Sequence, residues 1–191
     1  MTEADREFHR KRVREYREQN PHTPFYTTSR YQAKKAGAFS DLTMEDAYDI
    51  YHTPDICAYC GKERGPDDGP RSFHIDHVIP LKQGGPNSRW NLVKVCASCN
   101  SSKETSSLID FYNRKPEFTK ARYDAVVKGM AEKSGFSETR ITELLLSSHE
   151  FELAIEREKA RMQAEIARFY REISGKLGAK ISTEYERKGT G

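Results

Sequence analysis

The cysteines constrain the fold of this chain more than any other feature. All four cysteines of the 191-residue sequence lie in two Cys-x-x-Cys pairs, Cys57 with Cys60 and Cys96 with Cys99. Four thiolates in two such pairs can close a tetrahedral zinc site that has no open position. A closed site of this kind does no chemistry, but it stabilises a domain whose apolar core is small. We therefore expect a structural Zn²⁺ ion held by all four thiols.

The composition agrees with a small core that carries helical extensions. Hydrophobic residues make up 36% of the chain and charged residues 32%, which is lean for one large core. The net charge of +3 says little about partners, but residues 1–40 carry nine Lys or Arg against five Asp or Glu. This basic segment either follows a polyanion or forms a solvated helix face, and the sequence leaves both interpretations open.

The sequence also bears on location. No apolar run approaches the length of a membrane span, and no apolar stretch follows the N-terminal residues as it would in a secretory signal. Paired Cys-x-x-Cys groups in a reducing compartment bind metal more often than they form disulfides. We therefore expect a cytoplasmic protein without a membrane partner.

Capping and turn signals predict an α+β chain that is mostly helical. A capping box at Thr2 and Asp5 predicts the first helix, and Gly37 is expected to end the second. Helices are predicted over residues 3–18, 29–35, 43–51, 99–104, 119–133, 137–148 and 150–174, and strands over 72–78 and 90–95. A frayed tail is expected from Gly175 onward.

The loop between the two cysteine pairs carries residues suited to chemistry. Asp76 and His77 lie inside this loop, and Asn100 directly follows Cys99. Carboxylate and amide oxygens are hard ligands suited to Mg²⁺ or Mn²⁺. A histidine beside such an ion can take a proton from water near neutral pH, and a divalent ion can neutralise charge that develops on a phosphodiester. Singly, each residue is more commonly a surface residue or a helix cap; together they predict phosphodiester hydrolysis.

Residues 57–103 resemble the zinc-containing HNH endonucleases of the ββα-metal nuclease group, which bacteria and phages encode. The matching residues are Cys57-x-x-Cys60, Asp76-His77-Val78-Ile79-Pro80-Leu81, Gly84-Gly85, Trp90-Asn91-Leu92 and Cys96-x-x-Cys99-Asn100-x-x-Lys103. The resemblance implies an α+β fold with a small ββα-metal core, stapled by the Cys₄ zinc site. An N-terminal helical arm and a helical C-terminal region would flank this core.

The resemblance also implies roles for individual residues. His77 would be the general base that activates water, and Asp76 and Asn100 would ligate the catalytic Mg²⁺ or Mn²⁺. Asn91 would hold the His77 imidazole in position through its amide or its backbone. Lys103, one helical turn beyond Asn100, would lie near a phosphate.

Three further residues are candidates for binding the substrate. Arg71 and Arg89 flank the motif and are expected to contact phosphates, although each is equally compatible with a solvated surface. His74 would share a strand face with Asp76 and approach the metal or the phosphate, or it would serve packing or solvation instead.

The sequence divides into three regions by composition and motif. Residues 1–54 are expected to form the basic N-terminal arm, 55–110 the zinc-bound HNH domain and 111–191 a helical region that dimerises or contacts DNA. Within the predicted helix 150–174, apolar residues recur at heptad-like spacing, at Ile155, Met162, Ile166, Phe169 and Ile173. This pattern indicates either a homodimer seam or packing onto the chain's own core.

Two functions of different classes follow from these features. The first is a metal-dependent endonuclease whose expected substrate is double-stranded DNA. HNH proteins of this kind occur in restriction, homing and phage packaging. The alternative is a zinc-stapled DNA-binding module without catalysis, which the basic N-terminal segment and the helical C-terminal third would suit. A binding module has no need for Asp76, His77 and Asn100 together, so the nuclease is the leading interpretation.

Overall fold

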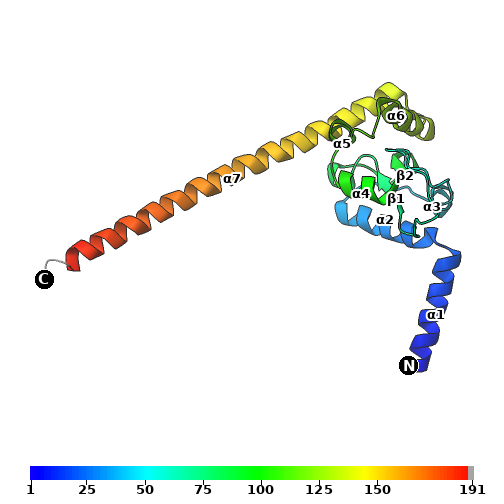
Figure 1. The fold of residues 1–191 in the computed structure, drawn as a ribbon, viewed down its shortest axis with the longest axis horizontal. Helices are drawn as coiled ribbons and strands as arrows, with labels where there is room; N and C mark the ends of the chain where they lie inside the picture. The colour runs from blue at the N-terminus through cyan, green and yellow to red at the C-terminus, as the bar shows by residue number, and fades with distance from the viewer. Residues whose placement is uncertain (189–191) are drawn as a thin grey trace. The chain divides into compact units, whose positions relative to one another are not determined.

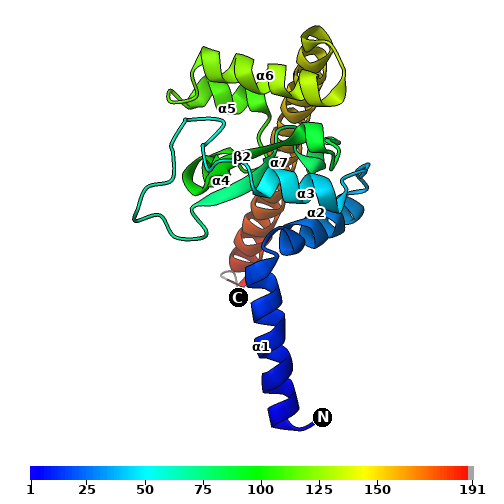
Figure 2. The ribbon, with the colours of Figure 1, turned by 90° about the vertical axis from the view of Figure 1, so that its right-hand side faces the viewer.

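The protein has an α+β fold with two compact units, Met1–Glu150 and Phe151–Gly191. The structure is a computed structural model that describes the backbone of residues 1–188 and the side chains of residues 1–174. Figures 1 and 2 show the elements from two directions. Where a frayed tail was predicted, helix α7 instead continues to Lys188, and positions 189–191 of that predicted tail lie outside the described residues.

A short antiparallel hairpin and one helix form the centre of the first unit. Strand β1 (Phe73–His77) pairs with β2 (Leu92–Cys96), and α4 (Ala97–Lys103) begins directly after β2. The connection between the strands contains two 3₁₀ turns, η1 (Leu81–Gln83) and η2 (Arg89–Asn91). The predicted strand–strand–helix order of the core is therefore confirmed.

Three helices precede the hairpin: α1 (Glu3–Gln19), α2 (His22–Ala36) and α3 (Met44–Tyr51). The capping box at Thr2 is present as predicted, and Gly37 ends α2 with φ at 67°. The predicted start of α2 near Ser29 is wrong, because the helix begins at His22. Pro24 lies in its first turn, where the backbone N–H that proline lacks would have no partner within the helix.

Three helices follow the ββα core. They are α5 (Leu108–Arg114), which the sequence did not predict, α6 (Lys120–Ser134) and α7 (Glu138–Lys188). The predicted break in α7 near Ser147 is wrong. The Ser147 hydroxyl donates to the carbonyl of Glu143 at 3.0 Å, so this side chain bonds within α7 and does not cap a helix end.

Helices cover the hairpin on two sides. In both views the hairpin lies between α6 and α2. The main core cluster runs from Cys57 to Leu145 and includes Phe111 and Phe118, so residues 108–145 pack on the same core as the cysteines. A second cluster joins Leu92 to the α2–α3 side. Much of the region expected to flank the HNH core therefore packs directly on it.

The first helix contributes little to these cores. Helix α1 has no buried residue. In the part of the chain that the structure describes, no helix combines the length and the apolar character needed to cross a membrane.

Candidate active site

The four cysteines are arranged for one tetrahedral metal ion. Their Sγ atoms all lie within 4.8 Å of one another, and those of Cys60 and Cys96 are 3.7 Å apart. Zn–S bonds of about 2.3 Å would set sulfur atoms roughly 3.8 Å apart at the corners of a tetrahedron. The backbone N–H of Cys60 points to the Sγ of Cys57 at 3.5 Å, as in a zinc knuckle. The geometry fits the predicted closed site.

The electrostatics of this cluster also call for a cation. Cys57, Cys96 and Cys99 are buried. Burial raises the pKa of Cys99, and the neighbouring charge of Cys57 raises it further. Four sulfur atoms this close cannot all be thiolates unless a positive ion compensates them. The residues present therefore suit Zn²⁺.

Asp76 is held by two neighbours through a single oxygen. The Tyr59 hydroxyl donates to its Oδ2 at 2.7 Å, and the Lys103 Nζ lies 3.0 Å from the same atom. Within the described residues, Oδ1 has no hydrogen-bond or ion-pair partner, and the side chain is 11% exposed. One carboxylate oxygen is therefore fixed, while the other is free to bind a hard cation.

Lys103 has a different position from the one expected. Its side chain is fully buried, and its Nζ also donates to the backbone carbonyl of His77 at 2.9 Å. Nothing in the structure supports the predicted phosphate contact, because the ammonium group faces Asp76 and the protein interior. Lys103 instead fixes Asp76 and the end of β1 by a buried, fully hydrogen-bonded ion pair.

Asn100 lies on the face of α4 that is turned toward β1. It is half-buried and precedes Lys103 by three residues, so the two side chains share a helix face. The ion pair between Lys103 and Asp76 shows that this face meets the end of β1. The start of α4 is in turn fixed by Cys96 and Cys99, the second cysteine pair.

The imidazole of His77 is oriented by Asn87. His77 ends β1, and its Nε2 lies 3.0 Å from Asn87 Oδ1. The Asn87 amide nitrogen donates to the Ser40 hydroxyl at 3.0 Å, so its oxygen accepts from His77 Nε2 and leaves Nδ1 as the acceptor. Burial lowers the pKa of His77, which favours the neutral imidazole that a base requires.

Asn91 fixes the connecting loop. Its Oδ1 accepts from the Ile79 N–H at 2.8 Å, and its Nδ2 donates to the carbonyls of Ile79 and Pro86, both at 2.9 Å. Its own carbonyl accepts from Val78 N–H at 2.9 Å. The hydrogen bond to the His77 imidazole comes from Asn87, so the orienting role expected of Asn91 would act through the loop and the Val78 backbone. Nothing in the sequence marks Asn87 except its place in a polar Pro-Asn-Ser turn.

His77 borders an open cleft of about 1000 Å³ between β1, α2 and the segment 64–71. His74 and Arg71, two predicted substrate residues, also border this cleft. The His74 Nε2 lies 3.0 Å from the Arg71 carbonyl, so the two residues are adjacent at its edge.

Arg89, the third predicted substrate residue, lies elsewhere. Its Nη1 is 2.7 Å from Asp49 and 3.2 Å from Asp46, both on α3. It does not border the cleft with His77. The expected phosphate contact is therefore not supported, since two carboxylates already balance this guanidinium.

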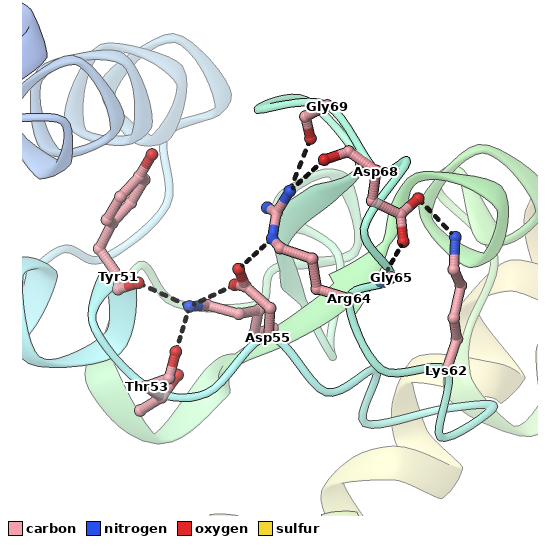
Figure 3. A network of polar contacts seen from close by, with 9 residues as sticks. Tyr51, Thr53, Asp55, Lys62, Arg64, Gly65, Asp68 and Gly69 are labelled. Atoms are coloured by element: carbon pink, nitrogen blue, oxygen red, sulfur yellow. Dashed lines mark hydrogen bonds and ion pairs between the residues drawn. The ribbon is translucent and has the colours of Figure 1, made fainter.

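A polar network anchors the segment beside the cleft (Figure 3). Asp55 accepts from Arg64 at 2.6 Å and pairs with Lys94 at 3.0 Å. The Arg64 guanidinium also donates to the carbonyls of Asp68 and Gly69, at 3.0 and 2.7 Å. Lys94 comes from β2 and donates to the Tyr51 carbonyl at the end of α3 at 2.6 Å. These contacts tie the segment to both β2 and α3.

An antiparallel hairpin and a following helix, with four cysteines placed to hold one metal ion, define a ββα-metal domain. Residues 57–106 match the family model "HNH endonuclease", so this segment is an HNH domain. The "CRISPR-associated endonuclease Cas9" of Corynebacterium diphtheriae is 45% identical over 51 residues, which are 25% of this chain and 4% of that protein.

A solved structure gives a broader but weaker likeness. The "Type II-C Cas9 enzyme from Actinomyces naeslundii" is 22% identical, with a TM-score of 0.36. The similarity covers 78% of this chain and 14% of that one. The chain thus spans only a small part of either relative.

Proposed function

We propose that this protein is a metal-dependent endonuclease that hydrolyses phosphodiester bonds in DNA. The observations that carry the proposal are two groups on adjacent residues at the end of β1: Asp76, with one carboxylate oxygen that has no partner among the described residues, and His77, with Nδ1 left as an acceptor. Asn100 belongs to the helix face that packs there. The endonuclease named among the relatives supports the same reaction class.

Asp76 and Asn100 would hold one Mg²⁺ or Mn²⁺ ion. When bound, such an ion supplies positive charge to the phosphate and to the leaving oxygen. The chain's own contribution is to fix the first ligand in advance, because Tyr59 and Lys103 immobilise Asp76 through Oδ2.

His77 would take a proton from the attacking water. The oxygen of that water forms a bond to phosphorus, and the bond from phosphorus to the leaving sugar oxygen breaks. Asn87 holds Nε2 so that Nδ1 receives the proton. Asn91 supports this arrangement by fixing the loop that carries Asn87.

A titration with divalent metal separates this proposal from a non-catalytic binding module. Supercoiled plasmid is incubated with the zinc-loaded protein at increasing Mg²⁺ or Mn²⁺. The proposal predicts nicked or linear product that depends on the added ion and is absent when neither ion is added. A module that only binds would shift the plasmid in a gel and leave it intact at every metal concentration.

The finer aspects of this function are proposals of the same kind. The substrate would be DNA rather than RNA, and this DNA would be double-stranded outside the active site. The protein would act in the cytoplasm, where its cysteines remain reduced and can bind zinc. A role in restriction or in phage biology fits the family. Cleavage-site mapping on a long plasmid reports strand count and sequence preference together.

We further propose that the second unit forms a homodimer seam. Ile155, Met162, Ile166, Phe169 and Ile173 repeat at heptad-like spacing and are 37–58% exposed. Two copies would place two single-strand-cutting sites in one particle. Sedimentation of the full chain and of a chain ending at Glu150 tests the dimer seam. The full chain is expected to be a dimer and the shortened chain a monomer. Equal oligomeric states of the two chains would refute the seam.

A further inference from the structure

The cleft beside His77 has a wall that the HNH motif does not supply. Pro24, Phe25 and Thr28 line it from α2, opposite His74 and His77 of β1. The family match covers residues 57–106 only, so α2 lies outside it. One side of the cleft thus belongs to the candidate active site, and the other belongs to the N-terminal region.

The charges of the cleft suit a phosphate chain. Arg64, Arg71 and Lys94 border it, against one acid, Asp55. Asp55 engages both Arg64 and Lys94, which leaves an excess of positive charge. In the described part of the chain, the Arg71 guanidinium has no ion-pair partner, and the residue is exposed. A cleft lined by one sign of charge concentrates oppositely charged ligands.

Aromatic side chains accompany these charges. Phe25 of α2, Tyr51 of α3 and Phe73 of β1 border the same cleft, each half-buried. Cationic groups beside aromatic rings are the combination with which proteins bind single strands, since phosphates meet the cations and unpaired bases stack on the rings. A small apolar ligand would not explain the cations, and a bare phosphate would not explain the rings.

We propose that α2 forms the second wall of the substrate cleft and that a single nucleic-acid strand lies between α2 and β1. The inference rests on the proposed function, because it assumes that His77 faces the phosphate to be cleaved. It adds that the N-terminal region holds the strand directly, at Thr28 and at Gln32 one turn further along α2, both of which border the cleft.

Two adjacent threonines provide a matched test. Thr28 borders the cleft, whereas Thr27 does not, and both are exposed on α2. Thr28→Glu places a carboxylate where the strand would lie, and Thr27→Glu places the same charge on the same helix outside the cleft. Binding of a fluorescent single-stranded DNA to the zinc-loaded protein is measured by anisotropy without added Mg²⁺ or Mn²⁺, so that no cleavage is needed. KM and kcat are measured separately with Mg²⁺.

The expected result is a Kd and KM raised about tenfold for Thr28→Glu, with kcat nearly unchanged, since one repelling charge acts on strand binding. Thr27→Glu should change Kd by about twofold or less, and Thr28→Lys should tighten binding. Equal effects of the two glutamates, or none, would overturn the proposal. So would a loss confined to duplex DNA. Because the binding assay is independent of catalysis, an inactive protein that still shows the difference would refute only the proposed function.

Discussion

At the scale of single residues, Tyr59 links the zinc knuckle to the candidate metal ligand. It lies between Cys57 and Cys60, is fully buried, and packs its ring on Phe111 while its hydroxyl reaches Asp76. The knuckle therefore does more than close a loop. It places a donor that helps to orient the carboxylate.

Tyr59→Phe removes only that donor. We expect the rate of cleavage to fall about tenfold to a hundredfold, as for other residues that orient a metal ligand. The free energy of unfolding should fall by about 1 kcal/mol, and the zinc content should stay the same. Tyr123→Phe is the control. The half-buried ring of Tyr123 packs on Phe118, as the ring of Tyr59 does, but the Tyr123 hydroxyl makes no hydrogen bond within the described residues. Equal rates for the two variants would remove Tyr59 from the mechanism.

Asn87→Ala tests the orientation of the base. The imidazole of His77 would lose the partner of its Nε2, and the Ser40 hydroxyl would lose its donor. Cleavage should slow by about tenfold to a hundredfold while the metal dependence of cleavage is retained. Thermal unfolding is recorded in parallel, with the exposed Asn113→Ala as the reference. A rate loss that disappears once the unfolded fraction is corrected for would contradict an orienting role.

The candidate reactive residues are easier to recognise in the sequence than the residues that support them. Asp76, His77 and Asn100 stand in a motif whose spacing is visible along the chain. Asn87 could not be recognised, because its contact with His77 exists only after the loop has closed back on β1. The burial of Lys103 was not foreseen for a related reason. The sequence shows a lysine near the site but does not show that its face of the helix is buried.

At the scale of secondary-structure elements, the loop between β1 and β2 depends on a close approach at Gly85. A Cβ atom there would collide with the backbone carbonyl of Ile79, which cannot rotate away as a side chain can. The same loop carries Asn87 and is fixed by Asn91. The glycine thus permits the turn that brings Asn87 to His77.

Gly85→Ala should therefore destabilise the protein by roughly 1–3 kcal/mol, as overpacking does, and should reduce cleavage beyond that loss. Gly129→Ala in α6 is the opposite case, because its Cβ would meet nothing within 4 Å. That variant should be more stable by about 0.5–1 kcal/mol. Denaturant unfolding measures both, and a neutral Gly85→Ala would show that the loop can relax around the added methyl group.

Element boundaries were predictable where local chemistry decides them. The capping boxes at Thr2 and Thr43 and the left-handed Gly37 mark helix ends that need no tertiary contact. The start of α2 was misjudged because a Pro in a first turn resembles a helix stop. Helix α5 was missed because it is short and its apolar residues, Leu108 and Phe111, are explained only by the core that they enter.

At the scale of the whole molecule, the zinc site lies within the main core of the first unit. Cys57, Cys96 and Cys99 belong to the same cluster as Phe118 and Leu145, so a metal bound to them would hold together segments from distant parts of the sequence. The extent of this shared core could not be read from the sequence. The composition predicts a small domain with separate helical arms. In the structure, much of these arms packs on the core of that domain.

Removal of zinc should therefore abolish cleavage by unfolding this core. After chelation with a strong ligand and dialysis, near-ultraviolet circular dichroism of the buried aromatic residues should decrease, and cleavage should be lost even with Mn²⁺ present. Returning one equivalent of Zn²⁺ should restore both signals. A zinc-free protein that still cleaves DNA would show that the cysteine site is dispensable for positioning Asn100 and Asp76.

The most direct test of the central claim is the activity of His77→Ala. The side chain lies at the end of β1 and only partly in the core, so the variant should keep its zinc and most of its stability. Plasmid cleavage is measured in Mn²⁺, with zinc content and thermal unfolding recorded on the same preparation. The account predicts a loss of cleavage of about a hundredfold or more with zinc retained. Undiminished cleavage by a folded, zinc-loaded His77→Ala protein would contradict it.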